Sequence, residues 1–231
     1  MNSLKKINSV CLIPEITCGQ QCPYCYEKHK KYGIPLSQEL YMNFVKKSIQ
    51  NLPSLTEVLI DYNGLESVQL LKSLIELIPQ VTTRLITTTL IGFDKAKELD
   101  AIFNISFHGE KDIPELKRII TAYPEKIGNI TLMAYDLSFL EELKALGIPV
   151  YVMVDKFSAA WKHMLPAQIY TSINELNVDN CLLTRVNQQE CPASTQINLY
   201  RDGSVRRCPY QPEEPANADY SKGCNLIGED K

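Results

Sequence analysis

Three cysteines near the amino terminus form the strongest chemical pattern in the chain. Cys18, Cys22 and Cys25 make a C-x3-C-x2-C array directly after an apolar, strand-like run over residues 10–16. A loop that leaves a strand end can turn its backbone so that three closely spaced sulfurs face one centre. Thiolates are the ligands that iron–sulfur clusters and zinc select. Three thiolates are one too few for the four irons of a cubane cluster, so one iron would be free to bind another molecule.

At these residues the chain resembles the radical S-adenosylmethionine (SAM) superfamily. Its signature is C-x3-C-x2-C with an aromatic residue just before the last cysteine, here Tyr24. The resemblance implies that Cys18, Cys22 and Cys25 hold a 4Fe-4S cluster whose fourth iron chelates the amino and carboxylate groups of SAM, with Tyr24 among the cofactor-binding residues. One electron would split SAM into methionine and a 5′-deoxyadenosyl radical, which abstracts hydrogen from a substrate. The cofactor carries the difficult chemistry, and the protein positions and shields it.

A zinc site is the alternative for the same residues. The three cysteines followed by His29 would supply Cys3His, which is a legitimate tetrahedral set. Zinc modules more often pair their cysteines two by two across a longer gap. The spacing therefore favours the cluster.

A second group of cysteines lies near the carboxyl terminus. Residues 196–200 and 205–208 are short extended runs, and Asp202-Gly203 between them is a hairpin signal. The hairpin would bring Cys191 towards Cys208. Since the chain has eight cysteines and we expect a reducing compartment, metal binding is favoured over disulfides.

This part of the chain resembles the Twitch domain, a short relative of the SPASM domain that is appended to many radical SAM enzymes. Its pattern is a cysteine, nine to fifteen residues, a glycine, four residues and a cysteine. Cys191, eleven residues, Gly203, four residues and Cys208 fit that pattern, and Cys224 matches a later cysteine. The resemblance implies an auxiliary 4Fe-4S cluster on Cys191, Cys208 and Cys224. Cys181 is the natural fourth ligand, although the pattern does not demand it.

The residues between these groups alternate between strand-like and helical patterns. Strands are expected at 10–16, 55–62, 81–91, 102–107, 130–135 and 150–154, helices at 37–52, 65–78, 94–99, 113–123 and 137–146, and a turn at 128–129. Such alternation implies parallel strands joined by right-handed crossovers. Six units are too few for a closed eight-stranded barrel, so the sheet should be curved and open.

The predicted fold class is therefore α/β. The resemblance implies a partial (β/α)6 radical SAM barrel over residues 1–157. Residues 158–231 would supply a linker helix near 161–176 and a small Twitch-like extension, built from a β-hairpin and helix, that holds the auxiliary cluster.

Chemistry in such folds collects at the carboxyl ends of the strands. The family usually places a Gly-Gly-Glu-Pro-like motif after the second strand to hold the SAM amino group. This chain has Asn63-Gly64-Leu65-Glu66, of which Gly64 and Glu66 preserve part.

Several other residues follow predicted strands. Ser106 is a candidate cofactor contact, and His108, Tyr135 and Asp155 are the leading candidates to face the substrate. Thr88, Thr89 and Asp136 have an alternative role as caps of the following helices. Cys11, inside the first strand, is expected to be a buried small apolar residue.

Composition limits the function classes. The 231 residues are 45% hydrophobic and 22% charged, as in an ordinary globular protein. The formal charge of −3 gives no global attraction to nucleic acid. No apolar run suggests a signal peptide or a membrane span, so we expect a cytoplasmic protein.

The expected function is SAM cleavage followed by hydrogen abstraction from a peptide or a small polar substrate. A flavodoxin- or ferredoxin-like donor would supply the electron. The auxiliary cluster would accept an electron from the substrate radical, giving oxidoreductase chemistry, or would bind the substrate. Only 17 residues precede the first ligand, so we expect no separate domain for binding a leader peptide.

Two alternatives remain. One is a redox-neutral epimerase in which Cys11 or Cys181 donates hydrogen. The other is a non-catalytic zinc or iron–sulfur binding protein.

Overall fold

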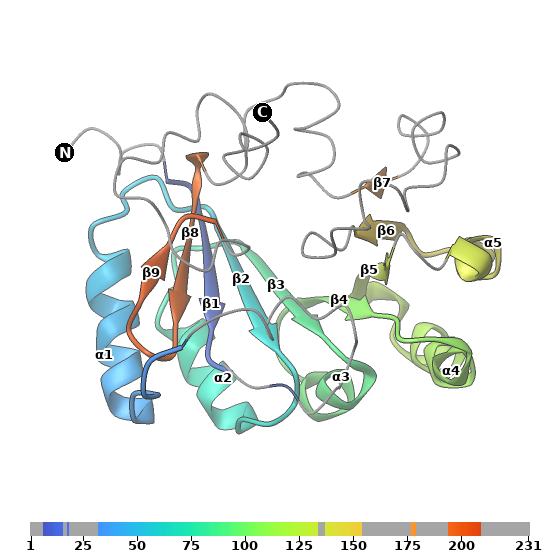
Figure 1. Cartoon of the computed structure of the whole chain (residues 1–231), viewed down its shortest axis with the longest axis horizontal. Helices are drawn as coiled ribbons and strands as arrows, with labels where there is room; N and C mark the ends of the chain where they lie inside the picture. The colour runs from blue at the N-terminus through green and yellow to red at the C-terminus, as the bar shows by residue number, and fades with distance from the viewer. Residues whose placement is uncertain are drawn as a thin grey trace, which may run out of the picture.

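The computed structural model describes residues 7–15, 18, 32–133, 137–153, 177–178 and 194–208. Strands and helices alternate along the first three-quarters of this part (Figure 1). The strands are β1 (Ser9–Ile13), β2 (Glu57–Tyr62), β3 (Thr83–Thr88), β4 (Ile102–Ser106), β5 (Ile127–Met133), β6 (Val150–Met153), β7 (Asn177–Val178), β8 (Gln196–Tyr200) and β9 (Val205–Arg206). The helices are α1 (Gln38–Ile49), α2 (Val68–Glu76), α3 (Leu90–Ala96), α4 (Ile113–Ala122) and α5 (Leu140–Lys144), with short 3-10 turns at Glu110–Asp112, Pro124–Lys126 and Leu137–Phe139.

The strands form one sheet in the order β7-β6-β5-β4-β3-β2-β1-β8-β9. Neighbouring strands are parallel except for the antiparallel pair β8 and β9. The order can be followed across Figure 1, where β1 to β3 run side by side and β4 to β7 stack one above another. The prediction of an open, mostly parallel α/β sheet is confirmed.

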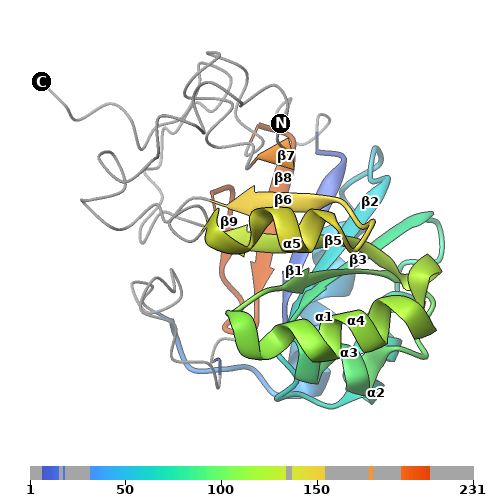
Figure 2. The ribbon, with the colours of Figure 1, turned by 90° about the vertical axis from the view of Figure 1, so that its right-hand side faces the viewer.

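The two faces of the sheet differ because successive residues of a strand point to opposite sides. One face packs on the helices (Figures 1 and 2), and its main-core residues include Val58 and Ile60 of β2. Leu71 of α2 and Phe93 of α3 meet them in the same apolar core. We call the opposite side of the sheet the inner face.

Side-chain caps fix where three helices begin. Ser37 accepts a hydrogen bond from Leu40 N at the start of α1, and Ser67 accepts one from Leu70 N at the start of α2. Thr89 does the same for Gly92 N at the start of α3. Each cap satisfies a backbone donor that the helix leaves unpaired.

Two predicted boundaries are wrong. The expected strand at 81–91 ends at Thr88 and the helix expected at 94–99 begins at Leu90, because the Thr89 cap turns the β-branched run into α3. The expected turn at 128–129 lies inside β5, and the turn is made by Pro124–Lys126. Gly128 is needed in the strand because a Cβ there would lie 2.7 Å from Ile102 Cγ2.

The predicted hairpin is confirmed as β8, a turn at residues 201–203, and β9. Its place in the sheet was not anticipated, since β8 pairs in parallel with β1 along its whole length. Ile197 and Leu199 join the main core, and the buried Tyr41 hydroxyl of α1 donates to Leu199 O at 3.0 Å. The hairpin is therefore packed as part of the sheet.

The predicted linker helix at 161–176 lies outside the described residues. Within the described ranges, no helix combines the length and apolar character that crossing a membrane requires.

Candidate functional site

The carboxyl ends of β1, β2 and β4 carry most of the sequence-predicted site residues that the structure describes. Cys18 follows β1 and is half-buried. Gly64 and Glu66 follow β2, while Ser106 ends β4 and His108 comes just after it. The adjacent pairing of β1 with β2 places Cys18 and the 63–66 loop beyond neighbouring strands at one edge of the sheet.

The 63–66 loop is held tightly against α3. Gly64 has φ +90°, and a Cβ at this position would lie 3.2 Å from Gly92 Cα in the first turn of α3. The Lys95 ammonium group donates to Gly64 O, and the Tyr62 hydroxyl donates to Glu66 O at 3.1 Å. Glycine is required here both by its backbone conformation and by the close approach.

Glu15 is a candidate site residue that the sequence analysis missed. Its side chain lies under the 63–66 loop and is 5% exposed. One carboxylate oxygen accepts from Glu66 N at 2.5 Å, and the other accepts from Asn63 N. Its only sequence signal is a lone acidic residue at the end of an apolar strand run.

Burial raises the pKa of Glu15 above its ordinary value, and the nearby carboxylate of Glu66 acts in the same direction. The backbone N–H groups of Asn63, Leu65 and Glu66 oppose the shift. The loop after β2 is thus fastened to the chain just before Cys18 through a desolvated carboxylate.

Arg201, in the turn between β8 and β9, completes this cluster. Arg201 is 8% exposed, and its guanidinium group donates to Glu66 Oε1 at 3.3 Å. The guanidinium carbon lies 5.5 Å from the ring centroid of Tyr41, which is a cation–π contact. A residue from the carboxyl-terminal hairpin therefore orients the acidic side chain that the sequence analysis assigned to the cofactor.

His108 is held at the end of β4 by Asp112. The backbone N of His108 donates to Asp112 Oδ2 at 2.7 Å, and Nδ1 lies 3.8 Å from the same oxygen. Burial lowers the pKa of His108, and the Asp112 carboxylate partly opposes that shift. The lowered pKa favours the neutral imidazole, which can both donate and accept a hydrogen bond.

The inner face of the sheet is rich in hydrogen-bonding groups. Asp61, Thr87 and Asn104 occupy adjacent register positions on β2, β3 and β4. Nearer the carboxyl ends, Ser106 pairs with Thr131 on β5. These polar positions lie beside a small apolar cluster of Cys11, Ile13 and Tyr200, against which Leu59 packs, so the inner face is polar in part.

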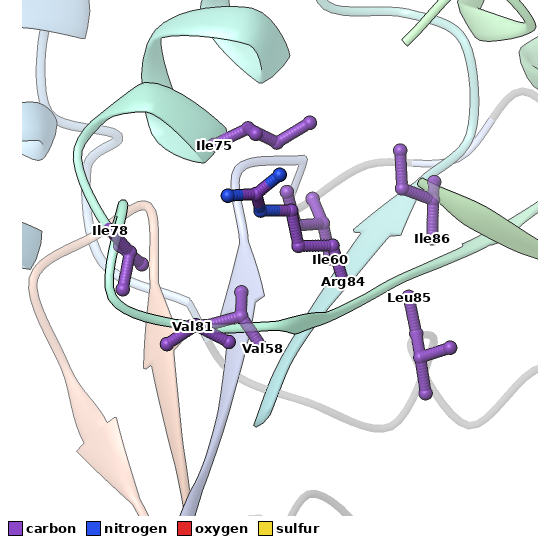
Figure 3. A pocket seen from close by; sticks show the side chains of 8 residues that line it. All are labelled: Val58, Ile60, Ile75, Ile78, Val81, Arg84, Leu85 and Ile86. Carbon is purple, nitrogen blue, oxygen red and sulfur yellow. The ribbon is translucent and has the colours of Figure 1, made fainter. Parts of the chain in front are cut away.

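An apolar pocket lies elsewhere, between α2 and strands β2 and β3 (Figure 3). Val58 and Arg84 are the second residues of their strands, so the pocket is near the amino ends of the strands. The lining residues are Val58, Ile60, Ile75, Ile78, Val81, Arg84, Leu85 and Ile86. The buried Arg84 Nε has no hydrogen-bond partner among the described residues, although Nη1 of the same side chain pairs with Asp100 at 2.8 Å. This lining offers no thiolate or carboxylate for a cluster.

Two further cysteines are described. Cys208 is buried just after β9, and Cys11 is buried on β1 in a small cluster with Ile13 and Tyr200. The prediction that Cys11 is a buried small residue is confirmed.

Most of the predicted ligands fall in the parts of the chain that the structure does not describe. Among the described residues, no three His, Cys, Asp or Glu side chains gather into a group that could hold a metal ion. The predicted site residues outside the described part are Cys22, Tyr24, Cys25, His29, Tyr135, Asp155, Cys181, Cys191 and Cys224.

No protein-family model and no curated protein matches the sequence. Two solved structures of SuiB from Streptococcus suis share the fold. The complex with the precursor peptide SuiA aligns with a TM-score of 0.60, at 12% identity, over 88% of this chain. The complex with S-adenosylmethionine aligns with a TM-score of 0.59, also at 12% identity and over 88% of this chain. The alignments cover 60% and 61% of the SuiB chains, and at this identity the likeness is one of fold.

Proposed function

We propose that the chain is a radical SAM enzyme that acts on a peptide. One observation carries the proposal: a C-x3-C-x2-C array begins just beyond β1 in a fold shared with SuiB, which binds SAM in one structure and a precursor peptide in another. The array alone also suits zinc, and the fold alone suits many activities. Their combination favours the radical SAM assignment.

Cys18, Cys22 and Cys25 are the residues that would hold the first 4Fe-4S cluster, with Tyr24 beside it. Cys18 follows β1 in the chain and is half-buried, which fits a ligand that must be shielded yet reachable. When bound, the cluster supplies the electron that cleaves SAM, and a flavodoxin- or ferredoxin-like protein would reduce it. The role of the chain itself would be to position the cysteines and exclude water.

The 63–66 loop is the part of the chain that we assign to the amino group of SAM. Glu15 accepts hydrogen bonds from backbone N–H groups of this loop, and Arg201 donates a hydrogen bond to Glu66 Oε1. The second carboxylate oxygen of Glu66 is the acceptor that we assign to the ammonium group. Ser106, at the end of β4, is the further cofactor contact.

The substrate would bind on the inner face of the sheet. Asp61, Thr87 and Asn104 offer acceptors and donors suited to peptide amides, and His108 stands at the carboxyl end of β4. Tyr135 and Asp155 are the other substrate-facing residues of the proposal. A small polar substrate would use the same groups.

Cys191, Cys208 and Cys224 would hold an auxiliary cluster, with Cys181 as the fourth ligand. The burial of Cys208 just after β9 suits a thiolate that is kept from water. An auxiliary cluster would take an electron from the substrate radical and favour an oxidised product, or would bind the substrate. The protein would work in the cytoplasm, where such clusters meet reducing partners.

Anaerobic reconstitution tests the proposal. A protein with two clusters should bind about eight irons per chain, four for each cluster, and convert SAM to 5′-deoxyadenosine when dithionite is added. Cys18→Ala should abolish that conversion, whereas Cys11→Ala should retain it because Cys11 is not among the proposed ligands. One zinc ion per chain without SAM cleavage would contradict the proposal and support a zinc-binding protein.

A further inference from the structure

We infer that the turn of the β8–β9 hairpin is a working part of the first cluster site, in which Arg201 and Asp202 position both ends of the segment that carries the C-x3-C-x2-C array. This inference rests on the proposed function, since that function assigns the three cysteines to the SAM-binding cluster. It is carried by backbone and side-chain contacts that join residues far apart in the sequence.

The turn holds the chain before the three cysteines. Arg201 N donates to Ile13 O at 3.0 Å, which continues the pairing with β1 one residue beyond the end of β8. Arg201 Nη1 lies 3.5 Å from Pro14 O, at the outer limit of a hydrogen bond. The direction in which the chain leaves β1 is consequently fixed by the hairpin.

The same turn holds the chain after the three cysteines. Gly33 N donates to Asp202 Oδ2 at 2.8 Å, and Leu36 N donates to Arg201 O at 2.9 Å. Arg201 Nε donates in return to Leu36 O at 2.6 Å. Residues 13–14 and 33–36, which flank the cysteine array, are thus fastened to two adjacent residues.

Arg201 also reaches the loop that we assign to SAM. The guanidinium group that contacts Pro14 and Leu36 donates to Glu66 Oε1 as well. A planar group with five N–H donors can serve three acceptors in different directions, whereas the single ammonium group of lysine cannot reproduce this arrangement. Arg201 is therefore a positioning residue that aligns the cluster segment with the cofactor loop.

Asp202 is itself fixed in place within the turn. Its Oδ1 accepts from Ser204 N at 3.0 Å and from the Ser204 hydroxyl at 2.6 Å, which leaves Oδ2 aimed at Gly33 N. The hairpin runs on to Cys208, a proposed ligand of the auxiliary cluster. A hydrogen-bonded turn thus links the segments that we assign to the two clusters.

Hydrogen exchange on the purified full chain tests the positioning role without relying on catalysis. Arg201→Lys and Asp202→Asn should speed exchange of the Gly33 and Leu36 amides about tenfold, since each variant weakens a bond that holds that segment. Arg118→Lys is the matched control, because Arg118 is exposed on α4 and pairs with Glu115 at 2.6 Å. Exchange at Gly33 and Leu36 equal to that of the control in both variants would overturn the inference.

The reconstituted variants give the second readout. Arg201→Lys should keep the iron content of the wild type, raise the KM for SAM about tenfold and leave kcat for SAM cleavage within a factor of two or so, as expected when a positioning contact is weakened. A KM for SAM unchanged in Arg201→Lys would also overturn the inference. Failure of the wild-type protein to bind iron or cleave SAM would instead remove the proposed function, so the two failures are distinguishable.

Discussion

Glu15 shows how one acidic residue can couple two parts of the site. It lies three residues before the first cysteine and binds the loop after β2 through both carboxylate oxygens. The backbone N–H groups that it accepts from offset part of the cost of burying this carboxyl group. Its sequence neighbourhood gave no sign of this, because its partners are backbone groups of a distant loop.

The first prediction concerns the pH dependence of stability. Burial holds the pKa of Glu15 above 4.5, so its contribution to stability is fully present below that value and is lost as pH rises through the raised value in the folded protein. Glu15→Gln cannot titrate, so its stability should decrease less with rising pH than that of the wild type. Urea unfolding of both proteins from about pH 4 to about pH 8 measures the difference.

Glu141→Gln is the control for Glu15, because the Glu141 side chain is 83% exposed. It should follow the wild-type curve. A constant difference in unfolding free energy between wild type and Glu15→Gln across this range would contradict the assignment.

The second prediction concerns His108. Its backbone N is fixed by Asp112, so the side chain can be changed without freeing the end of β4. His108→Gln should lower kcat/KM for the substrate about tenfold, as for loss of one hydrogen bond, and leave the rate of SAM cleavage without substrate unchanged. Parallel assays of 5′-deoxyadenosine and of modified product measure the two effects. Equal loss in both assays would show that His108 serves the cofactor and not the substrate.

At the scale of elements, the alternation of strands and helices was predictable from hydrophobic pattern and caps. The wrong boundaries arose where a local sequence pattern is compatible with both a strand and another structure. Residues 89–91 are β-branched or apolar and read as strand, but the Thr89 hydroxyl caps α3. The pairing of β8 with β1 could not be predicted, because the two strands are far apart in the sequence. Neither strand has a sequence pattern that identifies the other as its neighbour.

The third prediction concerns the approach of the 63–66 loop to α3. Gly64→Ala should destabilise the fold through its φ of +90° and through contact with Gly92. Gly147→Ala is the matched control, because Gly147 has φ +76° with nothing within 4 Å of the added Cβ. The backbone conformation alone costs about 1–2 kcal/mol, so Gly64→Ala should exceed Gly147→Ala by the cost of the close contact. Equal losses in urea unfolding would contradict the close approach.

The fourth prediction concerns the packing of the hairpin on α1. Tyr41→Phe removes the buried hydroxyl that donates to Leu199 O and should lower the free energy of unfolding by about 0.5–1.5 kcal/mol. Tyr123→Phe, on a half-buried ring that packs edge-on against Phe93, should cost less. Thermal or urea unfolding distinguishes the two. A Tyr41→Phe variant as stable as the wild type would indicate that the hairpin is not bound to α1 in solution.

At the scale of the whole molecule, the sheet separates two environments. Helices cover one face with an apolar core, and the inner face carries polar side chains on β2, β3 and β4. The proposed chemistry rests on cysteine spacing, since ligand type and spacing are properties of the sequence. The contacts of Glu15, Arg201 and Asp202 could not be predicted, because they join residues that come together only across the folded sheet.

The most direct test of the account is the electron paramagnetic resonance spectrum of the reduced first cluster with and without SAM. The variant Cys191→Ala, Cys208→Ala, Cys224→Ala removes the proposed auxiliary ligands and leaves Cys18, Cys22 and Cys25. After anaerobic reconstitution and reduction it should hold about four irons and give a cluster signal that shifts when SAM is added, because one iron lacks a protein ligand. A chain that retains no cluster, or a signal that SAM leaves unchanged, would contradict the central claim.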